Sequence, residues 1–507
     1  MIDNQVKSEI DRLWQDFATG GISNPLTIIE QISFLIFIRL LDMEEAQHEI
    51  NAIRLGGSPH HFFRVDQQTL RWKNWSRMSD SEAMFKLVRD DVFPHLRTLD
   101  GKKYTFGEYM KNVSLQISKA DLLVSVVEQL GSLPLGKSGT QGDLYEYLLS
   151  KLTTAGIHGQ FLTPHHIIKL MVELLDPKPS ETVGDPACGT AGFLVEVMEY
   201  QRRTYSTTAL VETVEGSSKV YYGGQPKLYQ GQIHYDMFHG FDFDATMLRL
   251  AAMNLMLHGV ENPDLNYMDT LSNIFPEKFP EIADGDRGGL DVILANPPLK
   301  GTLAEDVHPS LLKIVQTRKS ELLFIVLVLR MLKRGGRSAT IVPDGVLFGS
   351  SKAHLAVREY LLDHNKLEGV ISLPPGVFRS FAGLSTAILM FTKGGCTQDV
   401  FFYDAQANGS SQEEKSQENS DNCLSDVLTQ YRRWRNGESD FTDRYAKAFK
   451  VPAADIRANN FELSLNRYRE SRHEELKSDD PKVILTRMRI LEAEIQRDMA
   501  ELEAMLR

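Results

Sequence analysis

Between residues 182 and 392 the sequence alternates short apolar runs with segments of helical periodicity. Strands that alternate with helices form a mostly parallel sheet with helices on both faces. We therefore expect a mixed, mostly parallel α/β domain over residues 151–400. The last two apolar runs are close enough in sequence to pair antiparallel, and we expect that pair at one edge of the sheet. The expected strands are 182–185, 240–243, 265–268, 292–295, 338–342, 368–373 and 386–392.

Polar residues stand where four of these strands end. Asp185, Asp242 and Asp269 close the first three, and Asn296 follows the fourth. Ligands of such sheets bind beyond the carboxyl ends of the strands. Any one of these residues alone is an ordinary turn residue, but four at successive strand ends indicate a binding site. Asp242 is placed to accept from two ribose hydroxyls, and Asp269 to face an adenine ring edge.

The loop after the first strand reads Asp-Pro-Ala-Cys-Gly-Thr-Ala-Gly over residues 185–192, and a helix is expected from Phe193. Gly189 and Gly192 permit a tight turn and a close approach of the backbone to a ligand. The helix N-terminus favours a carboxylate or a phosphate. Neither GxGxxG nor GxxxxGK[ST] is present, so the loop does not indicate a dinucleotide or an ATP phosphate cradle. A purely structural strand–turn–helix is the alternative.

The fourth strand stops at Asn296-Pro297-Pro298. Two prolines stiffen the loop and remove two N–H donors, so the loop presents mainly acceptors. The side-chain carbonyl of Asn296 and the main-chain carbonyl of Pro297 are suited to holding the two hydrogens of an exocyclic amine. An ordinary proline-containing loop is again the alternative.

The regions on either side of the sheet differ in character. Residues 1–150 have helical periodicity and predict an all-α domain, in which Trp72 and Trp75 either anchor a loop or form a nucleic-acid patch, with anchoring favoured. Residues 401–460 are expected to be a loop or linker, and 461–507 a tail with an amphipathic helix. This helix packs either on its own domain or against a partner helix. Its apolar stripe comprises Ile484, Met488, Leu491, Ile495, Met499, Leu502 and Leu506.

The composition excludes several classes of protein. The 507 residues carry a formal charge of 56 − 68 = −12, whereas a chain that binds DNA strongly by itself is usually basic. Three cysteines form no disulfide framework, which suits a reducing cytoplasm, and no apolar run approaches the ~20 residues of a membrane span. We expect no metal, because the adjacent His165 and His166, with His158, point in different directions. Cys188 lacks an obvious base and is less favoured as a nucleophile.

Taken in order, these motifs resemble the N6-adenine DNA methyltransferases. Residues 185–194 look like the loop that binds S-adenosylmethionine in that family, 296–299 like its catalytic Asn/Asp-Pro-Pro-aromatic motif, and 160–165 like the segment covering the methionine part of the cofactor. The modification subunit of type I restriction-modification systems is the nearest match within it. That match continues through residues 240–242, 253–255, 258–259, 333–337, 342–346 and 373–378, and the N-terminal helices fit its helical domain.

The resemblance implies a Rossmann-like, S-adenosylmethionine-dependent methyltransferase that acts on N6 of an adenine flipped out of double-stranded DNA. It also implies a separate specificity subunit that reads the target sequence, a second copy of this chain and a restriction subunit. The implied catalytic residues are Asn296, Pro297, Pro298 and Leu299. The implied cofactor-binding residues are Gln160, Phe161, Leu162, Thr163, Pro164, His165, Asp185, Pro186, Gly189, Thr190, Ala191, Gly192, Asp242 and Asp269.

The sequence departs from the family at Leu299, where Phe or Tyr normally stacks on the flipped base. Stacking is worth roughly 1–3 kcal/mol per base. Leu299 therefore leaves open a non-catalytic scaffold that binds cofactor and partner. A methyltransferase acting on another amine or amide, such as that of protein glutamine, is also open, because the Asn-Pro-Pro-aromatic motif serves there too.

Overall fold

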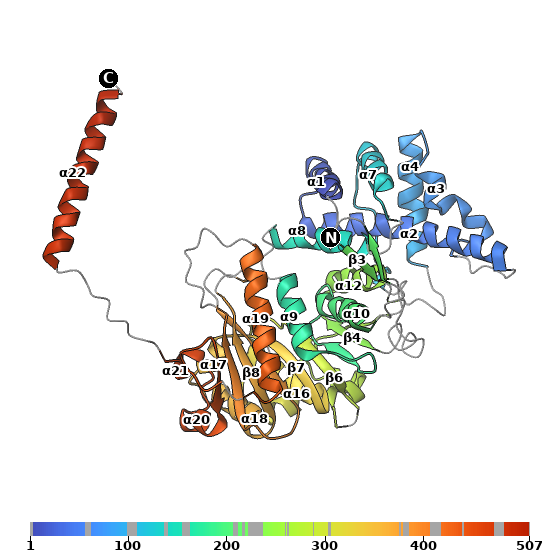
Figure 1. Cartoon of the computed structure of the whole chain (residues 1–507). Coiled ribbons are helices and arrows are strands. Elements are labelled where there is room, and N and C mark those ends of the chain that lie inside the picture. The colour runs from blue at the N-terminus through green and yellow to red at the C-terminus, as the bar shows by residue number, and fades with distance from the viewer. Residues whose placement is uncertain are drawn as a thin grey trace.

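Figure 1 shows the computed structural model of the chain, with a helical region above and a sheet-containing region below. The structure describes residues 4–55, 62–98, 109–135, 140–154, 163–205, 211–214, 218–221, 237–258, 260, 263–286, 288–302, 306–374, 377–378, 385–405, 417–438, 441–470 and 481–505. Among the described helices, none combines the length and apolarity needed to cross a bilayer.

The N-terminal region is helical, as its periodicity predicted. Trp72 and Trp75 are 7% and 1% exposed, and the Trp75 indole donates to the Leu70 carbonyl at 3.0 Å. The anchoring role is therefore confirmed for these tryptophans. The elements are α1 (Asn4–Thr19), α2 (Pro25–Leu55), η1 (Val65–Leu70), α3 (Trp72–Trp75), α4 (Ser81–Leu87), η2 (Val88–Val92), α5 (Phe93–Leu96), α7 (Ala120–Ser132) and α8 (Thr140–Thr154).

A nine-stranded sheet forms the second region, in the order β11-β10-β8-β9-β7-β6-β1-β4-β5. All seven expected strands are present, and β1, β4, β5, β6 and β7 run parallel to their neighbours on that side of the sheet. The strands are β1 (Val183–Asp185), β4 (Phe238–Asp242), β5 (Asp264–Tyr267), β6 (Leu290–Ala295), β7 (Leu332–Pro343), β8 (Lys366–Ser372), β9 (Thr386–Thr392), β10 (Asp399–Asp404) and β11 (Ala448–Pro452).

Two expectations about this sheet were wrong. The β8–β9 pair is antiparallel as expected but does not lie at an edge, because β9 separates β7 from β8 and the sheet continues through β10 and β11. Residues 401–460 are not a linker, since they hold most of β10, the helix α19 (Gln417–Arg435) and β11. Phe401 and Phe402 are fully buried on opposite faces of the sheet, so their burial places them in a strand although the sequence that follows them is polar. Residues 406–416 of that polar stretch lie outside the described part.

Helices cover both faces of the sheet. One apolar core joins the sheet to α9 (His165–Leu175), α10 (Gly192–Tyr205), α12 (Ala245–Leu257) and α19. The helices of the other core are α13 (Phe275–Lys278), α14 (Pro280–Ala283), α15 (Pro309–Leu312), α16 (Ser320–Met331), α17 (Gly345–Phe348), α18 (Lys352–Asp363), α20 (Ala453–Ala458) and α21 (Leu465–Tyr468).

The helix α12 joins the two regions, because both of its sides are buried. Leu248 and Leu255 pack into the core of the sheet, whereas Leu250 and Met253 pack into the core of the N-terminal helices. The helical region is thereby held against the carboxyl end of β4, where the expected cofactor residues lie.

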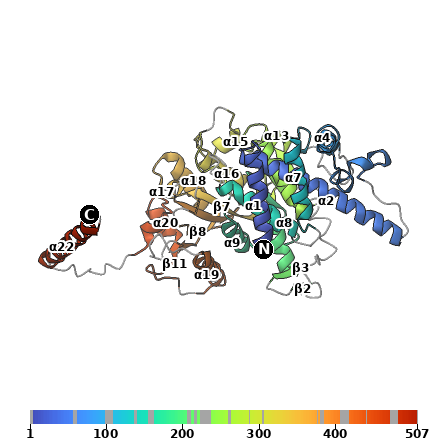
Figure 2. The ribbon, with the colours of Figure 1, turned by 90° about the horizontal axis from the view of Figure 1, so that it is seen from above.

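Two elements lie outside these layers. A two-stranded hairpin is formed by β2 (Val211–Val214) and β3 (Ser218–Tyr221). The C-terminal helix α22 (Pro481–Met505) stands clear of the body in both orientations (Figures 1 and 2). Apolar residues of its predicted stripe are more than half exposed, namely Met488, Leu491, Ile495 and Met499. Packing on its own domain is therefore not what the structure shows.

Candidate cofactor pocket and catalytic loop

The loop after β1 is tied to the neighbouring strand by its own backbone. The amide of Cys188 donates to the carbonyl of Phe241 at 2.9 Å, and the amide of Gly189 donates to Oδ2 of Asp242 at 3.0 Å. Gly189 has a φ of 53°, in the left-handed region that glycine adopts at low cost, and Ala191 has a φ of 61°. The predicted tight turn is therefore present, and α10 begins directly after it at Gly192.

Burial raises the pKa of both carboxylates at this loop. Asp185 is 1% exposed and accepts a hydrogen bond from the amide of Ala187 at 3.0 Å. Burial raises the pKa of Asp185 to about 8, and the nearby Asp242 carboxylate adds to the effect. Burial also raises the pKa of Asp242, although the amides of Asp244 and Gly189 oppose the shift. A buried acid of this kind gains from any donor that a ligand brings.

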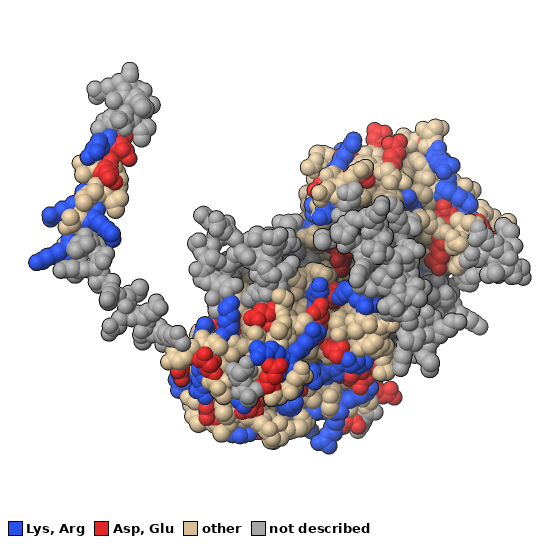
Figure 3. Space-filling model, in the orientation of Figure 1, with Lys and Arg blue, Asp and Glu red and all other residues tan. Residues whose placement is uncertain are grey.

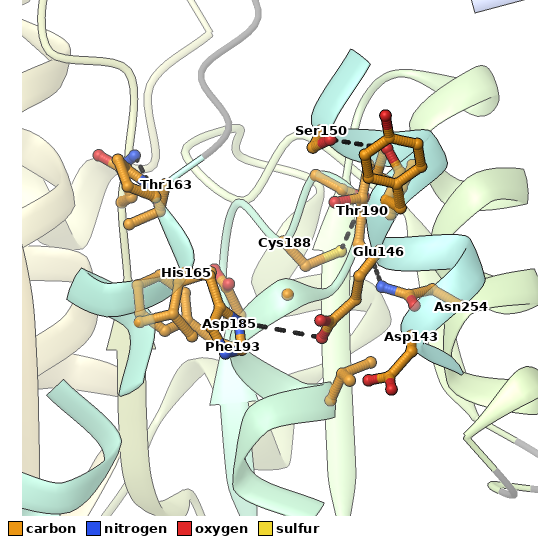
Figure 4. A pocket seen from close by; sticks show the side chains of 18 of the residues that line it. Asp143, Glu146, Ser150, Thr163, His165, Asp185, Cys188, Thr190, Phe193 and Asn254 are labelled. Carbon is orange, nitrogen blue, oxygen red and sulfur yellow. Dashed lines mark hydrogen bonds and ion pairs between the residues drawn. The ribbon is translucent and has the colours of Figure 1, made fainter. Parts of the chain in front are cut away.

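A cavity of about 510 Å³ opens in front of this loop (Figure 4). It lies between α8 on one side and the N-terminus of α10 on the other, and its size suits a cofactor of nucleoside dimensions. Predicted site residues from three separate segments meet around it. They are Thr163, Pro164, His165, Asp185, Gly189, Thr190, Gly192 and Asn296.

Other predicted residues lie near the cavity without lining it. Asp242 accepts from the amide of Gly189, which does line the cavity, and the Pro186 carbonyl accepts from the Thr270 hydroxyl at 3.1 Å. Ala191 is fully buried. Asp269 is exposed at the end of β5, where its carboxylate accepts from the amide of Leu271 at 3.0 Å. Gln160, Phe161 and Leu162 lie outside the described residues.

Asn296 follows β6 and reaches the segment that covers the cavity. Its Nδ2 donates to Oγ1 of Thr163 at 2.9 Å, which fixes the orientation of the side-chain amide. Its Oδ1 is buried and accepts no hydrogen bond from any residue that the structure describes. A buried acceptor without a donor costs roughly 1–3 kcal/mol, so this oxygen is poised for a donor from a ligand.

Leu299 does not face the cavity. Its side chain is 1% exposed and packs into the apolar core that contains Ile168 and Leu373. The position where the family's aromatic residue stands is thus used here as core.

Several cavity residues were missed by the sequence analysis. Lys7 of α1, Asp143, Glu146 and Tyr147 of α8, and Asn254 of α12 all line the same cavity. Asp143 and Glu146 stand three residues apart on a helix that also carries Leu144, Leu148 and Leu149, so their spacing signals one polar face beside an apolar one. Only the tertiary packing reveals that this face meets the loop after β1.

The sequence raised two other kinds of reactive group, a cysteine nucleophile and a metal site. Burial raises the pKa of Cys188 well above that of a free thiol, so the thiolate that a nucleophile needs is disfavoured. Within the described part of the chain, no group of three metal-binding side chains converges on one point.

Comparison with known proteins identifies the family. A family model described as N-6 DNA Methylase matches residues 137–477, and one described as HsdM N-terminal domain matches residues 2–130. The chain belongs to the N-6 DNA methylase family. The resemblance to type I modification subunits is thereby confirmed, together with the Rossmann-like methyltransferase fold.

Relatives within the N-6 DNA methylases match over most of their length. The methylase subunit of the type I restriction enzyme EcoEI from Escherichia coli is 29% identical over 97% of this chain and 95% of its own. The StySJI methylase subunit from Salmonella typhimurium is 33% identical over 80% of this chain and 72% of its own.

Solved structures show the same architecture. A chain from work on complex assembly and conformational transition of the type I restriction-modification system has a TM-score of 0.68 at 25% identity and covers 98% of both chains. A type I methyltransferase subunit from Streptococcus thermophilus has a TM-score of 0.67 at 19% identity, covering 92% of this chain and 100% of its own. The second likeness concerns the fold alone.

Proposed function

We propose that this chain is the modification subunit of a type I restriction-modification system and methylates N6 of adenine in DNA. The assignment of the catalytic site rests on the hydrogen bonding of Asn296. Its amide is oriented by Thr163, and its Oδ1 is a buried acceptor without a donor. An exocyclic amine presents the donor that this atom lacks.

The cavity fits S-adenosylmethionine as cofactor. The backbone turn at Gly189 to Gly192 and the N-terminus of α10 suit an anionic group, and Asp185 and Asp242 suit hydroxyl or amine donors. When bound, S-adenosylmethionine supplies a methyl group carried on a positively charged sulfur. We assign Thr163, Pro164, His165, Asp185, Gly189, Thr190, Gly192 and Asp242 to its binding, with Pro186 and Ala191 shaping the loop.

The catalytic loop acts on the target amine. Asn296 Oδ1 accepts one N6 hydrogen and the Pro297 carbonyl accepts the other. This makes the nitrogen less planar, so its lone pair is no longer delocalised into the ring and can attack. The adenine has to leave the duplex for both hydrogens to be reached. Each acceptor contributes about 1–3 kcal/mol where the bond forms best in the transition state.

Reading of the target sequence and cleavage of DNA are functions that we propose for partner subunits. We propose double-stranded DNA as substrate, a specificity subunit that reads the sequence, and a second copy of this chain and a restriction subunit in the full complex. The exposed apolar stripe of α22 supports a helix–helix contact with the specificity subunit. Because the substrate is the cell's own DNA, we propose a cytoplasmic location.

The test measures N6-methyladenine in DNA of methylation-free bacteria that co-express this chain with its specificity subunit. We expect Asn296→Ala to lower methylation about 10- to 100-fold or more, because it removes one acceptor and the orienting bond to Thr163. Asn273→Ala is the matched control, since Asn273 is exposed and away from the cavity. Equal methylation with Ala and Asn at 296 would contradict the assignment of the catalytic loop.

The burial of Leu299 allows a test of the alternative that the chain is a non-catalytic scaffold. We expect Leu299→Phe to cost about 1–3 kcal/mol of stability through overpacking and to leave methylation no higher than before. Chemical unfolding and the methyladenine assay measure the two effects. A chain that binds cofactor and methylates only after Leu299→Phe would show that the natural sequence is a scaffold.

A further inference from the structure

One wall of the cavity comes from the helical region and is charged. Asp143 and Glu146 lie on one face of α8, and both line the cavity together with Lys7 of α1. Figure 4 shows the Glu146 side chain reaching toward His165, whose Nδ1 is 3.9 Å from the Glu146 Oε1. Burial raises the pKa of Glu146 and the nearby His165 opposes that shift, so a further cation in the cavity would favour the ionised carboxylate.

A third acceptor on the same side is buried. Asn254 of α12 is 2% exposed and lines the cavity. Its Nδ2 donates to the carbonyl of Thr190 at 2.8 Å, which fixes the amide. Its Oδ1 is buried and accepts no hydrogen bond within the described part of the chain. A hydrogen-bond donor from a ligand would therefore stabilise this oxygen, as it would Oδ1 of Asn296 in the catalytic loop.

The two unpartnered oxygens belong to different ends of the cavity. In Figure 4, Thr163, which holds Asn296, lies on the opposite side of the view from Asn254 and Asp143. The target amine belongs with Asn296, so the second group of acceptors serves another donor. An ammonium group has three N–H donors and one positive charge, which match two carboxylates and one amide oxygen.

We propose that Asp143, Glu146 and Asn254 bind the α-ammonium group of the cofactor's methionine portion. Lys7, on the same wall, carries the charge that complements the α-carboxylate. This inference rests on the proposed function, because it takes S-adenosylmethionine as the occupant of the cavity. A sulfonium carries no N–H donor and leaves Asn254 Oδ1 unsatisfied, so the ammonium is the better match.

The arrangement links cofactor binding to the packing of the helical region. α8 is part of the helical core through Tyr145 and Leu148, while its carboxylates face the loop at the sheet. A cofactor held by both sides ties the N-terminal helices to the methyltransferase domain.

The experiment compares three ligands by isothermal titration calorimetry on the full chain. They are S-adenosylmethionine, S-adenosylhomocysteine, which lacks the sulfonium charge, and 5′-methylthioadenosine, which lacks the amino-acid portion. We expect Glu146→Gln and Asp143→Asn each to weaken the first two about 10- to 100-fold, and by similar factors, while 5′-methylthioadenosine changes less than about twofold. Glu82→Gln, an exposed position on α4, is the matched control and leaves all three unchanged.

Other patterns overturn the inference. Loss of affinity for S-adenosylmethionine alone would mean that the carboxylates balance the sulfonium. Equal loss for all three ligands would mean that the wall only shapes the cavity, and no loss would mean that it does not contact the cofactor. Thermal unfolding of each variant confirms that the fold is retained. Failure of the unaltered chain to bind any of the three ligands would count against the cofactor in the proposed function, which is a separate result.

Discussion

Asp185 and Asp242 both end strands beside the loop at residues 185–192, but the structure gives them different surroundings. Asp242 accepts from the amides of Gly189 and Asp244, at 3.0 and 2.8 Å. Asp185 is almost fully buried and accepts from the Ala187 amide. Because fewer donors compensate its burial, the pKa of Asp185 rises to about 8. Asp242 therefore shapes the loop through two amide hydrogen bonds, whereas the burial of Asp185 favours its protonated form.

This difference predicts a pH dependence of stability. A carboxyl whose pKa is raised on folding binds its proton more tightly in the folded state. It therefore destabilises the fold as the pH rises from the pKa of this group in the unfolded chain toward its folded-state pKa of about 8. We expect the free energy of unfolding to fall over this range by at most about 1.4 kcal/mol per pH unit on account of this group. Asp185→Asn keeps an acceptor for the Ala187 amide and removes the titration. Urea unfolding from pH 5 to 9 measures the slope for both proteins, and identical slopes would contradict the assignment.

At the scale of elements, the position of α8 decides the shape of the cavity. Gly142 precedes the two carboxylates of α8 and lies against His258, which follows α12. A Cβ at Gly142 would lie 2.2 Å from the His258 Nε2. The imidazole is 8% exposed, and its Nδ1 is 2.8 Å from the Asn254 carbonyl, so the ring has little room to move. Glycine at this position lets α8 approach α12 closely enough to complete the wall.

We expect Gly142→Ala to cost about 1–3 kcal/mol of stability and to weaken S-adenosylmethionine binding, because α8 must shift away from His258. Gly131→Ala is the control: it too lies in a helix, α7, but a Cβ there meets nothing within 4 Å. There we expect a small gain of up to about 1 kcal/mol from helix propensity. Thermal unfolding and calorimetry measure both effects. Similar losses in both variants would mean that the contact with His258 is unimportant.

The elements themselves were largely predictable from the sequence, but their arrangement was not. Strand positions and the turn at Gly189 are local properties and could be predicted, because apolar runs and glycines leave a signal in the sequence. The order of strands is not local. β10 and β11 were missed because a polar stretch separates them, and the antiparallel β8–β9 pair was therefore wrongly placed at an edge of the sheet. The α8 wall and the burial of Leu299 depend on which surfaces meet, and no pattern within a segment specifies that.

For the molecule as a whole, the net charge and the C-terminal helix both bear on the partners that we propose. The chain carries a net charge of −12, and basic and acidic side chains are interspersed on the face shown in Figure 3. A surface of mixed sign gains little from the phosphate backbone, whose neutralisation dominates DNA affinity. If the proposed function holds, we therefore expect DNA binding to need basic surface that a partner adds.

The exposed apolar face of α22 is suited to contact with a partner helix. Leu491 and Ile495 are 57% and 58% exposed, one turn apart on the same face, and the helix stands away from the body. Burial of such side chains is worth about 1.5–3 kcal/mol each. We expect Leu491→Asp with Ile495→Asp to weaken assembly with the specificity subunit about 100-fold or more while leaving cofactor binding and thermal unfolding unchanged. Thr486→Asp with Gln496→Asp adds the same charge at exposed polar positions and should leave assembly intact. Size-exclusion chromatography with light scattering measures the complex. Full assembly of the apolar-face variant would mean that the partner contacts another surface of this chain.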